Sequence, residues 1–274
     1  MGFRPTTAEI SLKNLTHNYK LICKTLPKNS FVCPMIKANA YGHGDKEVAQ
    51  ALIRAGAKRF GVCLIEEAVK LRDYKIKSEI LTFDIFDKPG AQAVVDYGLT
   101  PALSSWEQLK ALEKTKIKKP VQVHLKFNTG MNRLGFDTSE APKLREYLNK
   151  HKKLNLSGIC THLAVGEDAG VAGGVTEAQL QKLNGLNQTF RDQEFHALNS
   201  SAIFGLAKNN FGLGARPGLS LYGIKPDSNV GATPDLKPVM STKSRLILLR
   251  TVKRGEKVSY GGRWQALKDS VIGV

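Results

Sequence analysis

The sequence predicts an α/β fold: a (β/α)8 barrel of the TIM type, followed by a partial, mostly β C-terminal region. Short apolar runs bounded by turn residues indicate buried strands, and each is followed by a longer segment with apolar residues at helical spacing. This strand-then-helix unit recurs as far as Arg216. Beyond a Gly- and Pro-rich stretch at 228–238 the helical period is lost, which indicates a change of architecture.

The predicted barrel strands share an apolar composition rich in β-branched and aromatic residues. They are residues 31–36, 59–64, 79–83, 99–103, 121–127, 156–163, 194–199 and 211–216. Near-continuous apolar runs of this kind are typical of parallel strands that are buried on both faces. Connections between them that contain helices favour the same parallel arrangement.

The intervening segments carry helix start and stop signals. An earlier helix is expected over 15–26, before the first barrel strand. The signals in the barrel are an N-cap at Asp45, a stop at Gly56, capping boxes pairing Ser104 with Glu107 and Thr176 with Gln179, and a first-turn proline at Pro142. A loose loop is expected over 166–174.

We therefore expect a barrel domain over residues 1–227 and the beginning of a β-rich domain over 228–274. In the second region, residues 244–252, 256–260 and 270–274 have β-type patterns, with a turn at Lys253-Arg254-Gly255. The sequence stops inside the last of these predicted strands, so we expect it to be a piece of a longer protein.

The composition is that of a globular protein without a membrane span, with 42% hydrophobic and 24% charged residues. The first residues lack the layout of a signal peptide, which makes the cytoplasm the expected location. The four cysteines, Cys23, Cys33, Cys63 and Cys160, are widely spaced and lack CxxC pairs. They are expected to be small core residues rather than disulfide partners or metal ligands.

The net charge of +17 is the least ordinary bulk property. Nucleic-acid binding is one interpretation, but the 41 Lys and Arg residues are scattered and no aromatic-basic motif or helix-turn-helix is found. We therefore expect a basic solvated surface and no nucleic-acid partner. Attraction of anionic small molecules is a further consequence of such a surface.

Lys37 lies at the carboxyl end of the first predicted strand, next to a glycine-rich loop. In parallel α/β folds, ligands bind at the carboxyl ends of strands. A solvated side chain is the alternative in so lysine-rich a chain. The apolar setting favours function, because desolvation lowers the pKa of a lysine and yields a nucleophilic amine.

Other polar residues follow later strands, and each also has an ordinary structural explanation. Lys126 lies at the end of an apolar strand, and Arg133 follows the Thr-Gly turn after it. A simple solvated loop would show the same pattern. His162 at a strand end is more often a hydrogen-bonded structural group. Asn199 and Ser200 have N-cap composition, although a helix start is also a phosphate site.

The run 34–44, Pro-Met-Ile-Lys-Ala-Asn-Ala-Tyr-Gly-His-Gly, closely resembles the lysine motif of alanine racemases, which are pyridoxal-phosphate (PLP) enzymes built on a barrel plus a β domain. The resemblance recurs along nearly the whole chain. It implies that Lys37 forms a Schiff base with PLP and that Tyr41 binds the phosphate.

Residues 124–136 resemble a second signature of this family. The resemblance implies that Arg133 contacts the cofactor's phenolic oxygen and the substrate carboxylate. It also implies that Lys126 is often carbamylated and holds Arg133 in place. The family usually has Asp where this chain has Asn128, a departure that weakens the local charge network.

The remaining cofactor contacts are implied by resemblance at later strand ends. A Thr-His motif places His162 beside the catalytic tyrosine, below the pyridine ring. The phosphate-binding serine matches Ser200, which follows Asn199, and the backbone N–H groups of Gly218 and Leu219 complete the phosphate cradle. The arginine that hydrogen-bonds the pyridine nitrogen matches Arg216.

A Ser-Tyr-Gly-Gly run at 259–262 is by itself only a turn. The resemblance implies that Tyr260 reaches the barrel of a partner subunit and acts as the second base, opposite Lys37, in a homodimer. Racemisation needs acid–base groups on both faces of one carbon. The implied activity is the interconversion of L- and D-alanine, which supplies D-alanine for peptidoglycan.

Two related activities stay open at this point. Broader-specificity racemases of the same fold usually carry Asn at the position of Lys126 and a Ser-Gly-Gly run nearby, and this chain has neither. A non-catalytic PLP-binding barrel would lack the β region that contains Tyr260.

Overall fold

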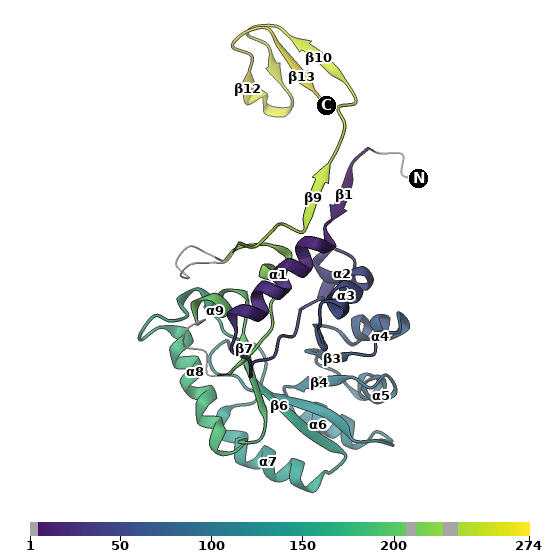
Figure 1. The fold of residues 1–274 in the computed structure, drawn as a ribbon, viewed down its shortest axis with the longest axis vertical. Coiled ribbons are helices and arrows are strands. Elements are labelled where there is room, and N and C mark those ends of the chain that lie inside the picture. The colour runs from purple at the N-terminus through teal and green to yellow at the C-terminus, as the bar shows by residue number, and fades with distance from the viewer. Residues whose placement is uncertain (1–4, 207–211, 227–234) are drawn as a thin grey trace. The chain divides into compact units, whose positions relative to one another are not determined.

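The computed structural model describes residues 5–206, 212–226 and 235–274 (Figure 1). Its main element is a seven-stranded parallel sheet in the order β2-β3-β4-β5-β6-β7-β8, so neighbours in the sheet are also consecutive in the chain. The strands are β2 (Arg59–Val62), β3 (Glu79–Thr82), β4 (Thr100–Leu103), β5 (Val121–Lys126), β6 (Leu154–Cys160), β7 (Glu194–Leu198) and β8 (Gly214–Ala215). Phe211, the predicted start of the last strand, lies outside the described residues.

Residues 31–36 occupy the first position of the barrel and link the two edges of this sheet. Val32 forms a parallel bridge with Ala215 of β8, and Met35 forms one with Gly61 of β2. The predicted regular strand is wrong in detail: it is reduced to these two isolated bridges, with Pro34 between them contributing no N–H to a ladder. The predicted (β/α)8 barrel is confirmed.

The helices lie outside the curled sheet (Figure 1). They are α1 (Leu12–Thr25), α2 (Lys37–Tyr41), α3 (Asp45–Arg54), α4 (Ile65–Asp73), α5 (Lys88–Asp96), α6 (Trp106–Glu113), α7 (Ala141–Lys150), α8 (Val175–Gly185) and α9 (Ser200–Gly205). Short 3-10 turns are η1 (Thr138–Glu140), η2 (Gly166–Asp168), η3 (Leu186–Gln188), η4 (Leu219–Tyr222) and η5 (Tyr260–Gly262). The stop at Gly56 and the first-turn Pro142 are confirmed.

Two helix starts differ from the prediction by one residue. Asp45 is the first residue of α3 rather than its N-cap, and its N–H donates to Oδ1 of Asn39 at 3.1 Å. The Asp45 carboxylate instead pairs with Nζ of Lys70 at 3.0 Å. In α6 the N-cap is Ser105 rather than Ser104, and its hydroxyl accepts from the Gln108 N–H.

The predicted capping box of α8 is wrong. The carboxylate of Asp168, within η2, accepts the N–H groups of Val175 and Thr176 and so caps the helix from the preceding loop. The buried Gln179 side chain accepts the Ala164 N–H at 2.8 Å and donates to the His162 carbonyl oxygen at 3.1 Å. Gln179 thus fixes residues 162–164, which directly follow β6 and precede the loop expected over 166–174.

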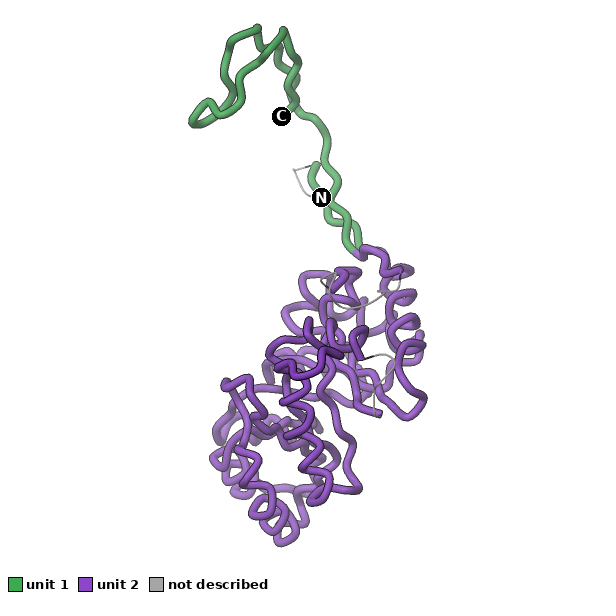
Figure 2. The backbone as a smooth tube through the Cα atoms, turned by 90° about the vertical axis from the view of Figure 1, so that its left-hand side faces the viewer, with its two compact units in different colours: residues 1–10, 240–274 green, residues 11–239 purple. Residues whose placement is uncertain are grey.

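The chain separates into two compact units (Figure 2). One is Ser11–Val239, and the other joins the described residues up to Ile10 with Met240–Val274. The expected boundary after Asp227 falls outside the described residues, whereas the contacts divide the chain after Val239. Whether these units are the two domains expected from the sequence stays a prediction.

The smaller unit consists of three antiparallel strand pairs. They are β1 (Thr7–Ile10) with β9 (Met240–Lys243), β10 (Leu249–Val252) with β13 (Ser270–Gly273), and β11 (Lys257–Val258) with β12 (Trp264–Gln265). The pairing of β1 with β9 joins opposite ends of the sequence and was not predicted. The predicted strands at 244–252 and 256–260 are shorter than expected, and Tyr260 belongs to η5.

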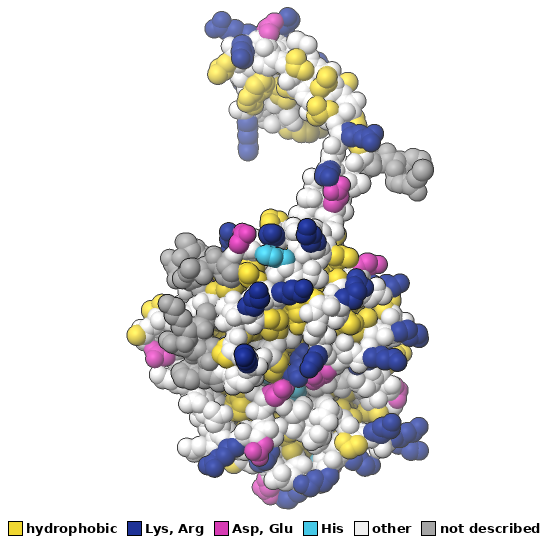
Figure 3. Space-filling view, viewed as in Figure 1, with side chains coloured by type: hydrophobic (Ala, Val, Ile, Leu, Met, Phe, Trp, Pro, Cys, Tyr) yellow, Lys and Arg dark blue, Asp and Glu magenta, His cyan; other side chains and the backbone are white. Residues whose placement is uncertain are grey.

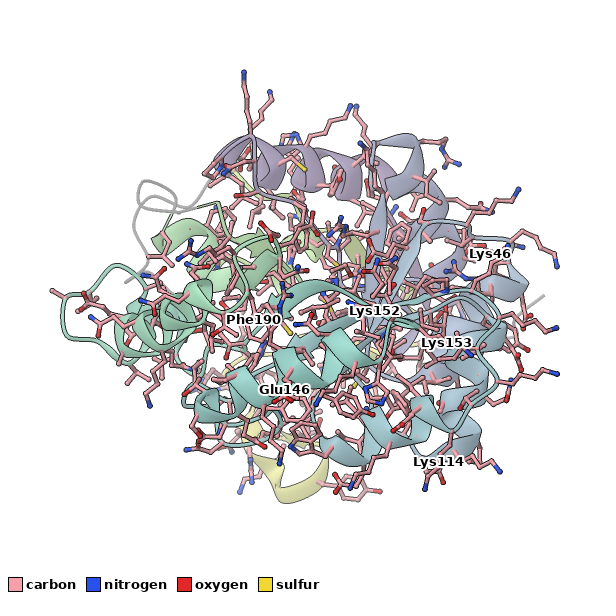
Figure 4. All side chains as sticks on the ribbon, turned by 90° about the horizontal axis from the view of Figure 1, so that it is seen from below. Lys46, Lys114, Glu146, Lys152, Lys153 and Phe190 are labelled. Atoms are coloured by element: carbon pink, nitrogen blue, oxygen red, sulfur yellow. The ribbon has the colours of Figure 1, made fainter. Side chains whose placement is uncertain are left out.

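The surface agrees with a dispersed basic charge. On the face of the larger unit seen in Figure 3, Lys and Arg side chains are spread out rather than gathered in one patch. Lys114, Lys152 and Lys153, which follow α6 and α7, are exposed (Figure 4). Among the described residues no helix is long and apolar enough to cross a membrane. All four cysteines are free; Cys33 and Cys160 are buried, whereas Cys23 is exposed.

The barrel core depends on large side chains without solvent exposure, and Phe60 of β2 is one of them. We predict that Phe60→Ala lowers the free energy of unfolding by about 3–5 kcal/mol, because it removes buried apolar surface and leaves a cavity. Urea denaturation followed by circular dichroism measures this change. The matched control is Lys58→Ala at the exposed position two residues earlier, for which less than about 0.5 kcal/mol is expected. Equal effects of both substitutions would contradict the described packing.

Candidate active site

The predicted site residues of the larger unit lie where parallel barrel elements end. Lys37 follows the segment 31–36, Lys126 ends β5, and His162 comes two residues after β6. Ser200 comes two residues after β7, and Arg216 directly follows β8. Because parallel strands end at a common rim, these side chains are brought to one end of the barrel, where (β/α)8 enzymes have their active sites.

Lys37 begins a left-handed helical turn. Ala38, Asn39, Ala40 and Tyr41 have φ angles of 49°, 53°, 54° and 55°. Such a run of non-glycine residues costs roughly 1–2 kcal/mol per residue, so the surrounding structure must hold it. The glycine-rich loop expected next to Lys37 begins only after this turn.

Glu67 of α4 supplies part of that support. Its carboxylate accepts the N–H of Ala38 through Oε1. Oε2 accepts the N–H groups of Cys63 at 2.8 Å and Leu64 at 2.9 Å, directly after β2. One carboxylate therefore joins the lysine turn to the end of the neighbouring strand. This role of Glu67 was not predicted, since nothing in the local sequence pattern links Glu67 to residue 38.

Tyr41, Ser200 and Gly218 form a compact cradle. Oγ of Ser200 accepts the backbone N–H groups of Gly218 at 3.2 Å and Ser220 at 3.1 Å. A Cβ atom at Gly218 would come within 2.5 Å of the Tyr41 hydroxyl, so glycine is needed there for this close approach. Hydroxyl and backbone N–H groups gathered in this way suit a phosphate.

Asn199 and Leu219 adjoin the cradle, and their predicted contacts with a phosphate stay predictions. Oδ1 of Asn199 accepts the Ala202 N–H at 3.0 Å and so caps α9. This is the N-cap role that its sequence context also indicated. Leu219 starts η4 with a side chain that is 48% exposed. Tyr222, which was not predicted as a contact, packs against Tyr41 with ring centroids 5.0 Å apart and donates its hydroxyl to the Met35 carbonyl.

Arg216 is buried and held by several acceptors. Its Nη1 lies 2.7 Å from Nδ1 of His196, and its Nη2 donates to the Thr161 carbonyl oxygen at 2.6 Å. Nη2 also lies 3.4 Å from Nδ1 of His162. Burial lowers the pKa of the Arg216 guanidinium, but an arginine remains protonated in proteins. The side chain is thus a fixed cation at the rim.

Lys126, Arg133 and His162 line one small pocket together with Thr161. Burial is the main cause that lowers the pKa of Lys126, and the charges of Arg216 and Arg133 act in the same direction. Within the described part of the chain, no carboxylate lies within ion-pair distance of Lys126. Burial, then Arg216, lowers the pKa of His162 to about 3, so this imidazole is neutral near pH 7.

Asn128, the departure from the family pattern, organises the loop that carries Arg133. Its Oδ1 accepts the N–H groups of Gly130 at 3.2 Å and Asn132 at 2.9 Å, and its Nδ2 donates to Oδ1 of Asn132. The neutral amide of Asn128 therefore supplies the hydrogen bonds that hold this turn. The Arg133 side chain is exposed.

Tyr260 belongs to the smaller unit, and its side chain is fully exposed, at 101%. Ser259 before it has a φ of 61° and Gly261 after it a φ of 73°, so the run 259–262 is the tight turn that its sequence indicates. Its predicted meeting with a barrel site stays a prediction.

The fold and the rim define a class of protein: a (β/α)8 enzyme barrel with a lysine at its first strand position and a phosphate-type cradle after β7 and β8. The family model for the alanine racemase N-terminal domain matches residues 10–226. The chain belongs to the alanine racemase family.

Individual relatives agree with this assignment. The alanine racemase of Carboxydothermus hydrogenoformans is 36% identical over 98% of this chain and 74% of its own length. The crystal structure of alanine racemase from E. faecalis has a TM-score of 0.90 at 28% identity, over all of this chain and 75% of that one. The alanine racemase from Bartonella henselae with covalently bound pyridoxal phosphate has a TM-score of 0.84 at 27% identity, over 98% and 74%.

Buried neutral histidines make the stability depend on pH. Burial, with Arg59 and Arg216 adding to it, lowers the pKa of His124 to about 3, against about 6.5 in the unfolded chain. Between these values the unfolded state binds more protons, so this stabilisation is present above pH 6.5 and is lost as the pH falls toward 3. We predict a loss of about 1.4 kcal/mol per pH unit from His124 below pH 6.

Urea denaturation at several pH values from 7 to 5 measures this slope. His124→Gln is expected to show a flatter dependence, whatever its absolute stability, because it removes the titrating ring. His17→Gln, on α1 outside the barrel core, serves as the control and should keep the wild-type slope. Identical slopes for His124→Gln and the wild type would show that His124 does not titrate on unfolding.

Proposed function

We propose that the carboxyl-end rim of the larger unit holds PLP. Lys37 would supply the amine for covalent attachment, Arg216 would face the ring nitrogen, and Tyr41, Ser200 and the N–H groups of Gly218 and Leu219 would bind the phosphate. The observation that carries this proposal is the convergence of Tyr41, Ser200 and Gly218 in one cradle on the rim to which Lys37 and Arg216 also belong. Asn199 would contribute by capping the helix that begins with Ser200.

As a member of its family the chain is a PLP-dependent isomerase that interconverts L- and D-alanine. When bound, PLP supplies an electron-withdrawing ring that makes the α-proton of an attached amino acid acidic. The protein's own groups must then do three things. They hold the ring, orient the substrate carboxylate, and move one proton between two faces of a carbon.

Arg216 would limit how strongly the cofactor ring withdraws electrons from the substrate. A guanidinium donates hydrogen bonds but accepts no proton, so a ring nitrogen facing Arg216 stays unprotonated. The electron demand on the substrate is then weaker than with an acidic partner, which disfavours side reactions such as transamination. A weaker electron demand suits an isomerase, because its reaction only removes the α-proton and returns it to the same carbon.

Arg133, held in place by Lys126, would contact the substrate carboxylate and the cofactor's phenolic oxygen. Burial without an acidic partner favours the neutral amine of Lys126, the form that reacts with carbon dioxide to give a carbamate. The carbamate is an anion, and it would neutralise the positive surroundings and attract the exposed Arg133. We therefore include carbamylation of Lys126 in the proposal.

Lys37 and Tyr260 are the proposed pair of acid–base groups. The fully exposed Tyr260 hydroxyl is free to enter the site of a partner subunit, so we propose a homodimer in which this tyrosine acts across the interface. His162, neutral and hydrogen-bonded near Arg216, would stand beside the tyrosine rather than act as the base. A cytoplasmic location, supply of D-alanine to peptidoglycan, and the lack of a nucleic-acid partner complete the proposal.

The two-base assignment predicts which proton transfer each residue performs. In Tyr260→Phe, Lys37 remains, so α-proton exchange with D₂O should persist for one enantiomer and fall at least about 100-fold for the other. By resemblance to the family, L-alanine is expected to lose exchange. Proton NMR of the α-position, with PLP-loaded protein and each enantiomer separately, measures both rates.

The matched control is Tyr147→Phe, a hydroxyl on α7 that bonds Glu113 far from the rim. It should exchange both enantiomers at the wild-type rate. Equal residual exchange of L- and D-alanine by Tyr260→Phe would exclude Tyr260 as the second base and leave His162 or a water as the candidate.

A further inference from the structure

A line of buried polar groups runs from Arg216 through the barrel to its opposite end. Nη1 of Arg216 lies 2.7 Å from Nδ1 of His196 in β7, and Nε2 of His196 lies 2.8 Å from Nδ1 of His124 in β5. Nε2 of His124 in turn lies 3.9 Å from Oε1 of Glu79. Glu79 is the first residue of β3, so the line spans the barrel from the carboxyl rim to the amino end.

Packing holds the two imidazoles in place, and neither residue is exposed to solvent. Gly158 of β6 leaves room for the His124 ring, since a Cβ there would come within 2.6 Å of its Cε1 and Nδ1 atoms. A Cβ at Gly214 would come within 2.9 Å of the Cβ of His196. The Phe31 ring lies against His196 with centroids 5.3 Å apart.

Arg216 fixes the direction of every hydrogen bond in this line. A guanidinium only donates, so Nδ1 of His196 must be an unprotonated acceptor. The neutral His196 ring then carries its proton on Nε2 and donates to Nδ1 of His124. His124 consequently carries its own proton on Nε2. Protonation of either ring would place two donors face to face and break the line.

The Nε2–H of His124, at the end of this line, points toward Glu79. Nε2 of His124 is buried and has no hydrogen-bond partner among the described residues. The nearest acidic atom is Oε1 of Glu79, whose other oxygen, Oε2, is paired with Nε of Arg59 at 3.2 Å. Arg59 also forms an ion pair with Glu194, the first residue of β7, in which Nη1 and Oε2 are 2.6 Å apart. An unpaired buried N–H is costly, so a slight rotation that joins His124 to Glu79 is favoured.

We propose that His196 and His124 are positioning residues for Arg216, and that Glu79 is the terminal acceptor that sets their proton arrangement. Nη1 and Nη2 of Arg216 make its contacts with the described residues of the protein. The Nε–H, without an acceptor in the described part of the chain, is therefore left as the donor for a ligand. The lowered pKa of both histidines is consistent with two neutral rings. The consequence for catalysis rests on the proposed role of Arg216 at the ring nitrogen.

Nitrogen NMR of the PLP-loaded full chain, labelled with ¹⁵N-histidine, tests the proton arrangement directly. His124 and His196 should each show a protonated Nε2 and an unprotonated Nδ1, unchanged from pH 8 to pH 5. His196→Gln and His124→Gln assign the two signals. Arg216→Lys keeps a donor and should keep the His196 pattern, whereas Arg216→Met removes the donor and should give mixed tautomers.

The amino end is tested with two substitutions at Glu79. Glu79→Leu should shift the His124 Nε2–H resonance and lower kcat by about 10-fold with little change in KM, a size typical of supporting groups behind an active site. Glu79→Gln keeps an acceptor oxygen and should restore both the resonance and most of kcat. Glu113→Gln, an acidic residue that bonds Tyr147 and His151 outside this line, is the control and should change neither.

A proton on Nδ1 of either ring, titration near pH 6.5, or wild-type tautomers in Arg216→Met would overturn the proposal. So would a His124 resonance that Glu79→Leu leaves unmoved. The NMR pattern does not depend on turnover. Loss of racemisation with an intact pattern would therefore count against the proposed function alone.

Discussion

The rest of the site depends on how residues 31–36 close the barrel. This segment bonds to β8 through the Cys33 N–H and the Ala215 carbonyl oxygen at 2.8 Å, and to β2 through the Ile36 N–H and the Gly61 carbonyl oxygen at 2.9 Å. Closure brings the two edges of the sheet together and sets Lys37 beside the ends of both β8 and β2. Without it, the lysine turn and the Ser200 cradle would belong to opposite edges of an open sheet.

The second constraint is electrostatic. Among the described buried residues, Asp45 alone carries a carboxylate, and it pairs with Lys70. Arg216 and Lys126 are buried at the rim without an acidic partner, and the nearby histidines are neutral. A buried cation without a counter-charge is unfavourable, so such a site gains from an anionic occupant. Phosphate, carboxylate and carbamate groups all meet this need.

Much of the barrel could be predicted because its strands are continuous apolar runs followed by amphipathic helices. The positions of Lys37, Ser200 and Arg216 at strand ends followed from the same pattern. The left-handed turn could not be predicted, because Ala38 to Tyr41 contain no glycine and their conformation depends on Glu67, a distant residue. The pairing of β1 with β9 likewise depends on contacts between opposite ends of the sequence.

The central claim is that Lys37, held by its left-handed turn at the rim, is the residue that binds PLP covalently. Borohydride reduction of the PLP-loaded protein, followed by proteolysis and tandem mass spectrometry, locates the attachment directly. We expect the pyridoxyl mass on the peptide that contains Lys37 and no label at any other lysine when Lys37→Ala is treated in the same way. A label on Lys126, or labelling of Lys37→Ala at the wild-type level, would contradict this account of the site.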